Sequence, residues 1–214
     1  MKVKICGITN LADALTAVEA GADYLGFIFY PPSKRSVDIN DARKIVVALR
    51  ERADCPVLVG VFVNETAERM TAVLNEVGLD LAQLSGEEAA SLVTDERSEL
   101  YGRGYKAIRP ASLAEAETAV RQYAVPVMPS ILMDTYHPTL RGGTGETGDW
   151  AAAAQLARQM PGLMLAGGLT PENVGEAVRV VRPYAVDVAS GVEAFPGKKD
   201  PEKVRAFVAN AKAG

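Results

Sequence analysis

The sequence has little with which to build a metal centre, a disulfide framework or a membrane span. Among 214 residues there is one histidine, His137, and there are two cysteines, Cys6 and Cys55. A single histidine excludes a multi-histidine metal site, and its place beside Pro138 favours a loop residue over a catalyst. Since no apolar run approaches the roughly 20 residues of a spanning helix, we expect no membrane association.

Excess positive charge and a secretion signal are also missing. The formal net charge is −4, whereas a nucleic-acid-binding protein usually carries a basic stripe, so we expect no nucleic-acid partner. The chain enters its first apolar run without the charged and hydrophobic regions of a signal peptide, and we expect a cytoplasmic protein. In a reducing compartment, both cysteines should be free thiols.

Short apolar runs alternate with amphipathic helical segments along the whole chain. The runs that we expect to be strands end at Cys6 or span residues 24–30, 56–63, 81–84, 105–108, 131–134, 163–166 and 185–189. The helices between them have predicted N-caps at Asn10, Asp38, Asn64, Ser112, Asp149, Thr170 and Asp200. This alternation predicts an α/β protein with one domain, residues 1–214, folded as a single (β/α)8 TIM barrel. A doubly wound parallel sheet is the structural alternative.

In a barrel, the carboxyl ends of the strands form one rim, where active sites are assembled. The chain places few reactive or ligand-binding groups at these positions. They are Cys6, Arg35, Gln83, Asp134, the pair Gly167-Gly168 and the pair Ser190-Gly191. Cys55 precedes a strand and should lie near the opposite rim, too far from Cys6 for a disulfide.

The last two pairs predict a phosphate-binding site. Glycines after strand seven let backbone N–H groups approach a ligand closely, and Ser190-Gly191 after strand eight can complete the cradle. Barrel enzymes commonly bind phosphate at these two loops. We therefore expect Gly167, Gly168, Ser190 and Gly191 to bind the phosphate of a small-molecule phosphosugar.

Two residues are candidates for proton transfer. Asp134 ends an otherwise apolar strand, where its pKa should tend to rise, as suits a general acid. Its other interpretation is a loop-pinning aspartate. Cys6 could face it across the rim and act as a base, although a lone thiol is more often a small buried hydrophobe. Arg35 could bind a carboxylate with its planar fork, or could be a solvated loop residue.

The motifs around these residues resemble the phosphoribosylanthranilate isomerase family over nearly the whole chain. The matching stretches are Lys4-Ile5-Cys6-Gly7, Gly26-Phe27-Ile28-Phe29, Ser33-Lys34-Arg35, Gln83-Leu84, Gly142-Gly143-Thr144-Gly145, Asp149-Trp150, 166–173, 187–193 and 196–200. So many matches in the same order are highly specific.

The resemblance implies an Amadori rearrangement in tryptophan biosynthesis that needs no cofactor. It implies Asp134 as general acid, Cys6 as thiolate general base, and Arg35 as the group that binds the anthranilate carboxylate. The resemblance also implies that Gln83 contacts the substrate. Gly7, which has no side chain, is expected to leave space for the substrate. The two proton-transfer groups predict a bell-shaped pH dependence of kcat/KM.

The chain departs from the family at two positions. Ser85 stands where the family usually has histidine, and Gly148 stands where it usually has an aromatic residue. The second change could loosen the segment 141–148, which we expect to close over substrate. A related aldose–ketose isomerase with aspartate in place of Cys6, a metal-dependent epimerase and a noncatalytic phosphosugar-binding protein are the functional alternatives. The sequence leaves a monomer or a homodimer open.

Overall fold

The computed structural model describes residues 1–135 and 150–214, and within them the parallel strands close into a barrel. The strands of the barrel are β1 (Lys2–Cys6), β2 (Tyr24–Ile28), β3 (Val57–Phe62), β4 (Leu81–Leu84), β5 (Gly104–Ile108), β6 (Ile131–Asp134), β7 (Leu163–Ala166) and β8 (Ala185–Val188). They pair in sequence order, and β8 pairs with β1. The prediction of a (β/α)8 barrel is confirmed.

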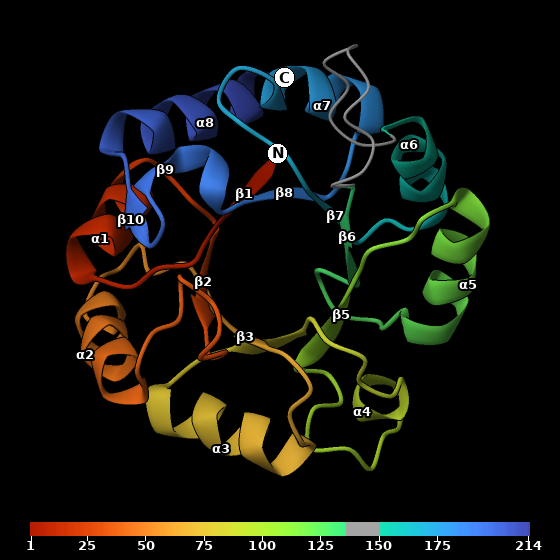
Figure 1. Cartoon of the computed structure of the whole chain (residues 1–214), viewed down its shortest axis with the longest axis horizontal. Coiled ribbons are helices and arrows are strands. Elements are labelled where there is room, and N and C mark those ends of the chain that lie inside the picture. Colours follow the sequence, from red (N-terminus) through yellow and green to blue (C-terminus); the bar gives the residue numbers. More distant parts are fainter. Residues whose placement is uncertain (136–149) are drawn as a thin grey trace.

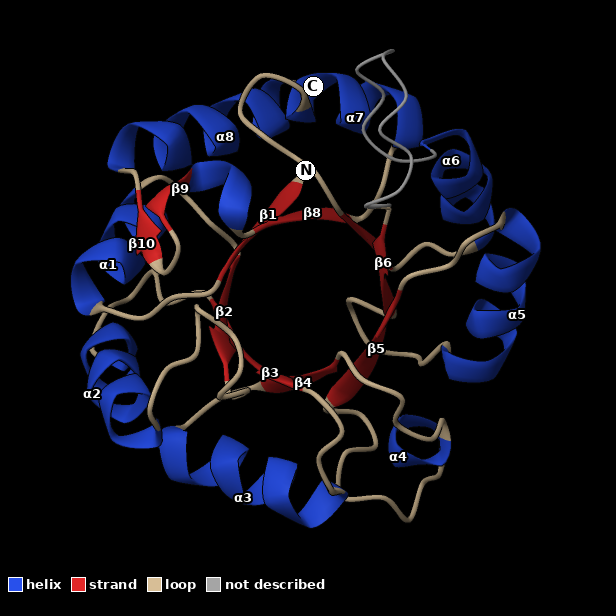
Figure 2. Cartoon of the chain, viewed as in Figure 1, coloured by secondary structure: helices blue, strands red, loops and turns tan. Residues whose placement is uncertain are grey.

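Helices surround the barrel as an outer ring (Figures 1 and 2). They are α1 (Leu11–Glu19), α2 (Ile39–Arg50), α3 (Ala67–Val77), α4 (Ser91–Thr94), α5 (Leu113–Tyr123), α6 (Trp150–Gln159), α7 (Val174–Val181) and α8 (Pro201–Ala213). Each longer helix buries one stripe against the strands. In α2 the stripe is Ala42, Ile45, Val46 and Leu49, and burying an aliphatic side chain of the size of Leu49 contributes about 1.5–3 kcal/mol.

Several predicted caps are confirmed. The side chains of Asn10, Asp38 and Ser112 accept hydrogen bonds from the first turns of α1, α2 and α5. Asp200 does the same for α8, whose first residue is proline. These interactions satisfy N–H groups that have no partner inside the helix.

Two predicted caps are wrong. Thr66, not Asn64, caps α3, because Asn64 has a left-handed φ of 56° and its side-chain oxygen instead accepts the N–H of Glu87. Thr170 does not cap α7, because that helix begins at Val174. The Asn173 side chain accepts the Thr170 N–H and donates to the Gly168 carbonyl, which holds the intervening residues in a turn.

A small antiparallel hairpin that the sequence analysis did not predict follows β8. It consists of β9 (Glu193–Phe195) and β10 (Lys198–Lys199), preceded by a short 3-10 helix, Ser190–Val192. An ion pair of Lys198 with Asp13, and a 2.8 Å hydrogen bond from the Lys199 N–H to the same carboxylate, join the hairpin to α1 (Figure 1). The hairpin is thereby fixed close to the loop that follows β1.

None of the helices in the described residues combines the length and hydropathy that a bilayer crossing needs. Both cysteines are free, as predicted, and Cys6 is buried while Cys55 is half-buried. The predicted histidine loop, the Gly142–Gly145 motif, the Asp149 cap and the segment 141–148 lie outside the described residues.

Candidate active site

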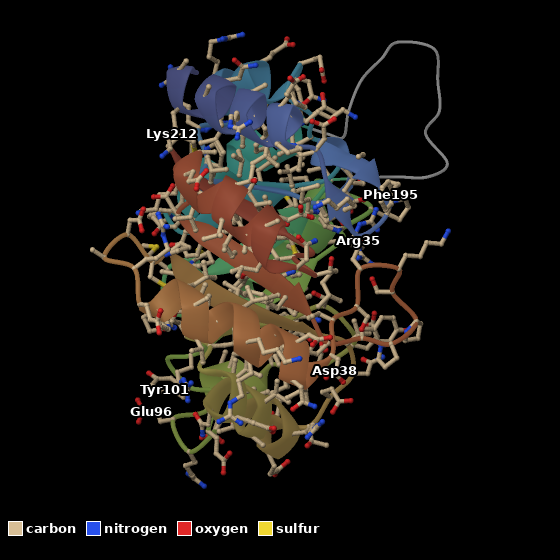
Figure 3. All side chains as sticks on the ribbon, turned by 90° about the vertical axis from the view of Figure 1, so that its left-hand side faces the viewer. Arg35, Asp38, Glu96, Tyr101, Phe195 and Lys212 are labelled. Atoms are coloured by element: carbon tan, nitrogen blue, oxygen red, sulfur yellow. The ribbon has the colours of Figure 1, made fainter. Side chains whose placement is uncertain are left out.

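The carboxyl ends of the strands bring the predicted site residues to one end of the barrel. Cys6 ends β1, Gln83 is the next-to-last residue of β4, and Asp134 ends β6. The predicted phosphate-binding pair Gly167-Gly168 follows β7 directly, and Ser190-Gly191 follows β8 after one residue, Ala189. Figure 3 shows Arg35 and Phe195 at this end of the molecule, with Lys212, Tyr101 and Glu96 toward the other.

The Cys6 thiol has its place because Gly26, its register partner on β2, has no side chain. A Cβ added at Gly26 would stand 2.7 Å from the Cys6 sulfur, well inside contact distance. Cys6 itself is 5% exposed. Gly7, with φ of 77°, leaves room for the aliphatic part of Arg35, whose Cδ would be 3.0 Å from an added Cβ. The Arg35 side chain therefore fills the space beside Gly7 that we expected to be left for the substrate.

The ionisation of Cys6 is set by opposing effects. Burial raises the pKa of the thiol above its ordinary value, because it disfavours the charged form. The Lys4 ammonium lowers this pKa, the Asp187 carboxylate raises it, and the Lys199 ammonium lowers it. The net shift is upward, so the thiolate depends on its cationic neighbours.

Lys4 is fully buried inside the barrel. Its Nζ donates hydrogen bonds of 2.9 Å to Asp187 and to the Gln83 amide oxygen, which also accepts from the Tyr105 hydroxyl. Burial lowers the pKa of Lys4, but Asp187 and Cys6 raise it by more, and the net shift is upward. Lys4 therefore keeps its charge at neutral pH.

The Gln83 amide is engaged on both sides. Its oxygen serves Lys4 and Tyr105, and its nitrogen donates to the Ser85 hydroxyl over 3.2 Å. Ser85 stands where the resemblance leads us to expect histidine. In the structure, the Gln83 amide holds Lys4, Tyr105 and Ser85 together below the rim. The predicted contact of Gln83 with substrate stays a prediction.

Arg35 is held by a buried carboxylate on the hairpin. Its Nε and Nη2 each donate to Glu193 over 2.8 Å, in the two-bond geometry that suits a guanidinium. Glu193 also accepts from Lys199 over 3.1 Å. Burial raises the pKa of Glu193, but Arg35 and Lys199 lower it by more, and the net shift is downward. The Arg35 side chain is 25% exposed, so it is partly accessible from solvent.

Asp134 has a more polar setting than its apolar strand indicated. Its side chain is 24% exposed, and Arg109, directly after β5, donates to it from Nε over 3.2 Å. Because the Arg109 side chain is 71% exposed, this pair is worth no more than about 1 kcal/mol. A pair this weak between Arg109 and Asp134 can be broken when a ligand binds or when Asp134 takes up a proton.

The two predicted phosphate loops have the backbone that they need. Gly167 and Gly168 both adopt positive φ, 99° and 65°, which side chains rarely allow. Gly191 lies against Leu169, since an added Cβ would stand 2.0 Å from the Leu169 carbonyl oxygen. Because these residues are glycine, the loop after β7 and the loop after β8 can pack closely against each other.

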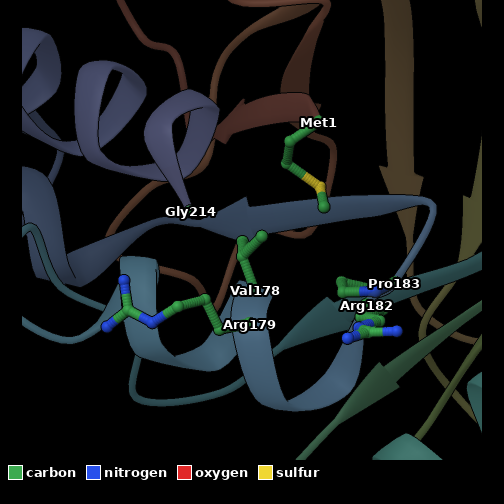
Figure 4. A pocket seen from close by; sticks show the side chains of 6 residues that line it. All are labelled: Met1, Val178, Arg179, Arg182, Pro183 and Gly214. Carbon is green, nitrogen blue, oxygen red and sulfur yellow. The ribbon is translucent and has the colours of Figure 1, made fainter.

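A separate cavity of about 350 Å³ lies at the amino end of the barrel, lined by Met1, Val178, Arg179, Arg182, Pro183 and Gly214 (Figure 4). Met1 precedes β1, and Arg182 and Pro183 precede β8. None of the predicted site residues lines it.

The chain matches the family model for N-(5′-phosphoribosyl)anthranilate (PRA) isomerase over residues 3–210. It belongs to the PRA isomerase family. The chain is 46% identical over 212 residues to the N-(5′-phosphoribosyl)anthranilate isomerase of Trichlorobacter lovleyi, covering 99% of this chain and 98% of that relative.

Solved PRA isomerase structures have the same fold. The Thermotoga maritima phosphoribosyl anthranilate isomerase crystal structure is 46% identical, with a TM-score of 0.86 and coverage of 100% of both chains. A phosphoribosyl anthranilate isomerase in complex with reduced 1-(o-carboxyphenylamino)-1-deoxyribulose 5-phosphate is 43% identical, with a TM-score of 0.82 and the same coverage.

Sequence reasoning missed several charged residues of this PRA isomerase family member. Lys4, Asp187, Glu193 and Lys199 all lie within matching motifs, but no role was assigned to them. Lys4 is two residues from Cys6 on one strand, so both side chains point to the same side. Two features of the sequence could have indicated such residues. One is the spacing of Lys4 and Cys6, and the other is the position of Arg109 directly after a strand.

Proposed function

We propose that the chain converts N-(5′-phosphoribosyl)anthranilate to 1-(2-carboxyphenylamino)-1-deoxyribulose 5-phosphate, a step of tryptophan biosynthesis. The observation that carries the proposal is the placement of Cys6 and Asp134 at the ends of β1 and β6. Family membership supports it, and so does the relative whose crystal structure contains the reduced product.

In the first step, Asp134 acts as general acid. The anthranilate nitrogen pushes electrons toward C1 and the bond from C1 to the ring oxygen breaks. That oxygen takes the proton from Asp134, which leaves an open-chain iminium ion and an aspartate. Arg109 can stabilise the Asp134 carboxylate that forms, since Arg109 donates a hydrogen bond to Asp134 in the structure.

In the second step, Cys6 acts as general base. Its thiolate takes the C2 proton, and the electrons of that bond move to the iminium nitrogen to give an enolamine. Tautomerisation of the enolamine, with a proton added at C1, yields the aminoketose. Both steps are proton transfers, and the substrate nitrogen serves as electron sink.

The groups around the rim provide the contacts that bind the substrate. Arg35 binds the anthranilate carboxylate with the guanidinium hydrogens that Glu193 does not take. Gly167, Gly168, Ser190 and Gly191 hold the phosphate through backbone N–H groups. Gln83 contributes at most a contact through its amide nitrogen, because its oxygen already accepts two hydrogen bonds.

The test is the fluorescence decay of phosphoribosylanthranilate on addition of purified protein, with EDTA present. Decay with formation of the aminoketose product is the expected result. Binding of substrate without decay contradicts the proposal and favours a noncatalytic phosphosugar-binding protein. Decay that requires added metal contradicts the cofactor-free chemistry.

A further inference from the structure

The charged groups around Cys6 are unbalanced while the thiol is neutral. Three cationic side chains, those of Lys4, Lys199 and Arg35, interact electrostatically with Cys6. Two carboxylates, Asp187 and Glu193, are bonded to these cations. With Lys199 protonated, three positive and two negative charges leave one positive charge over, and ionisation of Cys6 cancels it. Burial lowers the pKa of Lys199 below its ordinary value, whereas Glu193 and Cys6 raise it, so a Cys6 thiolate and the Lys199 ammonium stabilise each other.

The neighbouring groups do not change this count. Tyr105 faces the cluster from β5, and burial raises the pKa of its hydroxyl, so it stays neutral near pH 7. Asp13 and Lys198 form an ion pair with each other, and Lys203, which donates to the Glu193 backbone carbonyl, is exposed to solvent. The remaining charge therefore belongs to the cluster formed by Lys4, Arg35, Asp187, Glu193 and Lys199.

Lys199 is the member of this cluster whose position is otherwise unexplained. It is 1% exposed, although lysine is almost never fully buried without a specific partner. Its Nζ donates to Glu193 and to the Ala189 carbonyl, which fixes the ammonium beside the end of β8. Glu193 already has a full partner in Arg35 through two hydrogen bonds. Holding Glu193 alone therefore does not require a second buried cation.

We propose that Lys199 is a positioning residue whose buried ammonium favours the thiolate form of Cys6. Lys4 lies two residues before Cys6 on β1. Lys199 reaches the same strand end, because its Nζ bonds the carbonyl of Ala189, which directly follows Val188, the register partner of Ile5. The hairpin thus contributes to the reaction without contacting substrate. The benefit of a thiolate to the reaction rests on the proposed function, whereas the ionisation of Cys6 does not.

The experiment follows the ionisation of Cys6 directly. In a Cys55→Ser background Cys6 is the only cysteine, and the 13Cβ NMR signal of labelled cysteine reports its titration. Lys199→Met removes the charge and keeps a similar length. We expect the titration midpoint to move upward by roughly 1–3 pH units, and we expect Lys199→Arg to restore it. An unchanged midpoint in folded Lys199→Met protein overturns the proposal.

A second variant tests the cluster from the opposite direction, and does so even if Lys199→Met does not fold. Glu193→Gln removes a negative charge while its amide oxygen can still accept from Arg35 and Lys199. The excess positive charge around Cys6 then grows, so the midpoint should move downward. An unchanged or raised midpoint contradicts the proposal.

Activity measurements separate this proposal from the proposed function. If the thiolate is the base, Lys199→Met lowers kcat/KM on its neutral plateau about tenfold for each pH unit by which the Cys6 midpoint rises. The alkaline limb moves upward with it. A merely structural role for Lys199 would lower the plateau without moving this limb. A shifted NMR titration in a protein without isomerase activity would uphold the role of Lys199 and refute the proposed function.

Discussion

Arg35 and Glu193, 158 residues apart in the sequence, are joined by two parallel hydrogen bonds of 2.8 Å each. The bond to Glu193 raises the pKa of Arg35, so the guanidinium is always charged. It also fixes the plane of the guanidinium at the rim of the barrel, before any ligand arrives. A preorganised cation of this kind suits recognition of a planar carboxylate.

Arg35→Lys should raise KM for phosphoribosylanthranilate much more than it lowers kcat. A lysine keeps the charge but cannot bond Glu193 and a substrate carboxylate with one planar fork. Loss of a charge-assisted hydrogen bond costs about 1.5–3 kcal/mol, or roughly 10- to 150-fold in KM. Steady-state kinetics checks this, with Arg52→Lys as control, since Arg52 pairs with Asp54 at the surface. An unchanged KM would contradict the role of Arg35.

Cys6→Ser and Asp134→Asn should each lower kcat by on the order of 10²–10⁴. Serine is a far weaker acid than a thiol, and asparagine cannot deliver a carboxyl proton. Both replacements are close in size to the original residues, so substrate binding should be largely kept. Stopped-flow fluorescence of substrate binding and decay separates the two effects. Near-wild-type turnover in either variant would refute the assignment of that residue.

The pH dependence of kcat/KM should be bell-shaped with a broad plateau. In the proposed mechanism, the reactive form needs a thiolate together with a protonated carboxyl, and a thiol ordinarily ionises at higher pH than a carboxyl. Under that condition, the alkaline limb reports the thiol. Because burial raises the pKa of Cys6 above its ordinary 9.0, activity should fall only above about pH 9. A decline centred near neutral pH would contradict this assignment.

The fold could be predicted from the sequence because its signals are local. Apolar runs, helix stripes and caps such as Asn10 and Asp38 depend on residues within a few positions of one another. The predictions failed where a side chain found a nonlocal or competing partner. Asn64 bonds Glu87 on the next rim loop, and Asn173 holds a turn in place of a helical start.

The candidate site was predictable in its positions but not in its interactions. Strand ends alone placed Cys6 and Asp134 on one rim. The positive charge around Cys6 comes from Lys4, Arg35 and Lys199, and Lys199 is 193 positions away from Cys6 in the sequence. Only the closed barrel and the hairpin after β8 bring Lys199 near the sulfur. No local pattern distinguishes Lys199, which is buried, from Lys198 beside it.

Gly26→Ala should reduce activity out of proportion to its effect on stability. The added Cβ would meet the Cys6 sulfur at 2.7 Å, so the thiol must move. If Cys6 is the base of the proposed mechanism, its displacement costs alignment with the C2 proton, for which we expect on the order of a hundredfold loss in kcat. Gly60→Ala is the matched control, because its Cβ would crowd the Phe62 ring at 2.7 Å and not Cys6. Equal activity losses at equal stability would contradict the prediction.

Glu88→Gln should weaken the protein at neutral pH and reduce its sensitivity to acid. Glu88 is 1% exposed in its side chain, forms a 2.7 Å ion pair with Lys106, and accepts the N–H groups of Asn64 and Gly86. Burial raises the pKa of Glu88, but Lys106 and the backbone N–H groups of Glu88 and Asn64 lower it by more, so it lies below the ordinary 4.5. Its contribution to stability is therefore complete above pH 4.5 and is lost as pH falls through the lowered pKa.

The variant has no carboxyl to protonate, so its free energy of unfolding should fall less steeply below pH 4.5 than that of the wild type. At pH 7 it leaves Lys106 buried without a counter-charge, which costs about 3–5 kcal/mol. Urea unfolding at several pH values measures both effects. Asp41→Asn is the control, because Asp41 and Lys44 form an exposed pair worth no more than about 1 kcal/mol. If Glu88→Gln kept the acid dependence of the wild type, the buried pair with Lys106 would not be a source of that dependence.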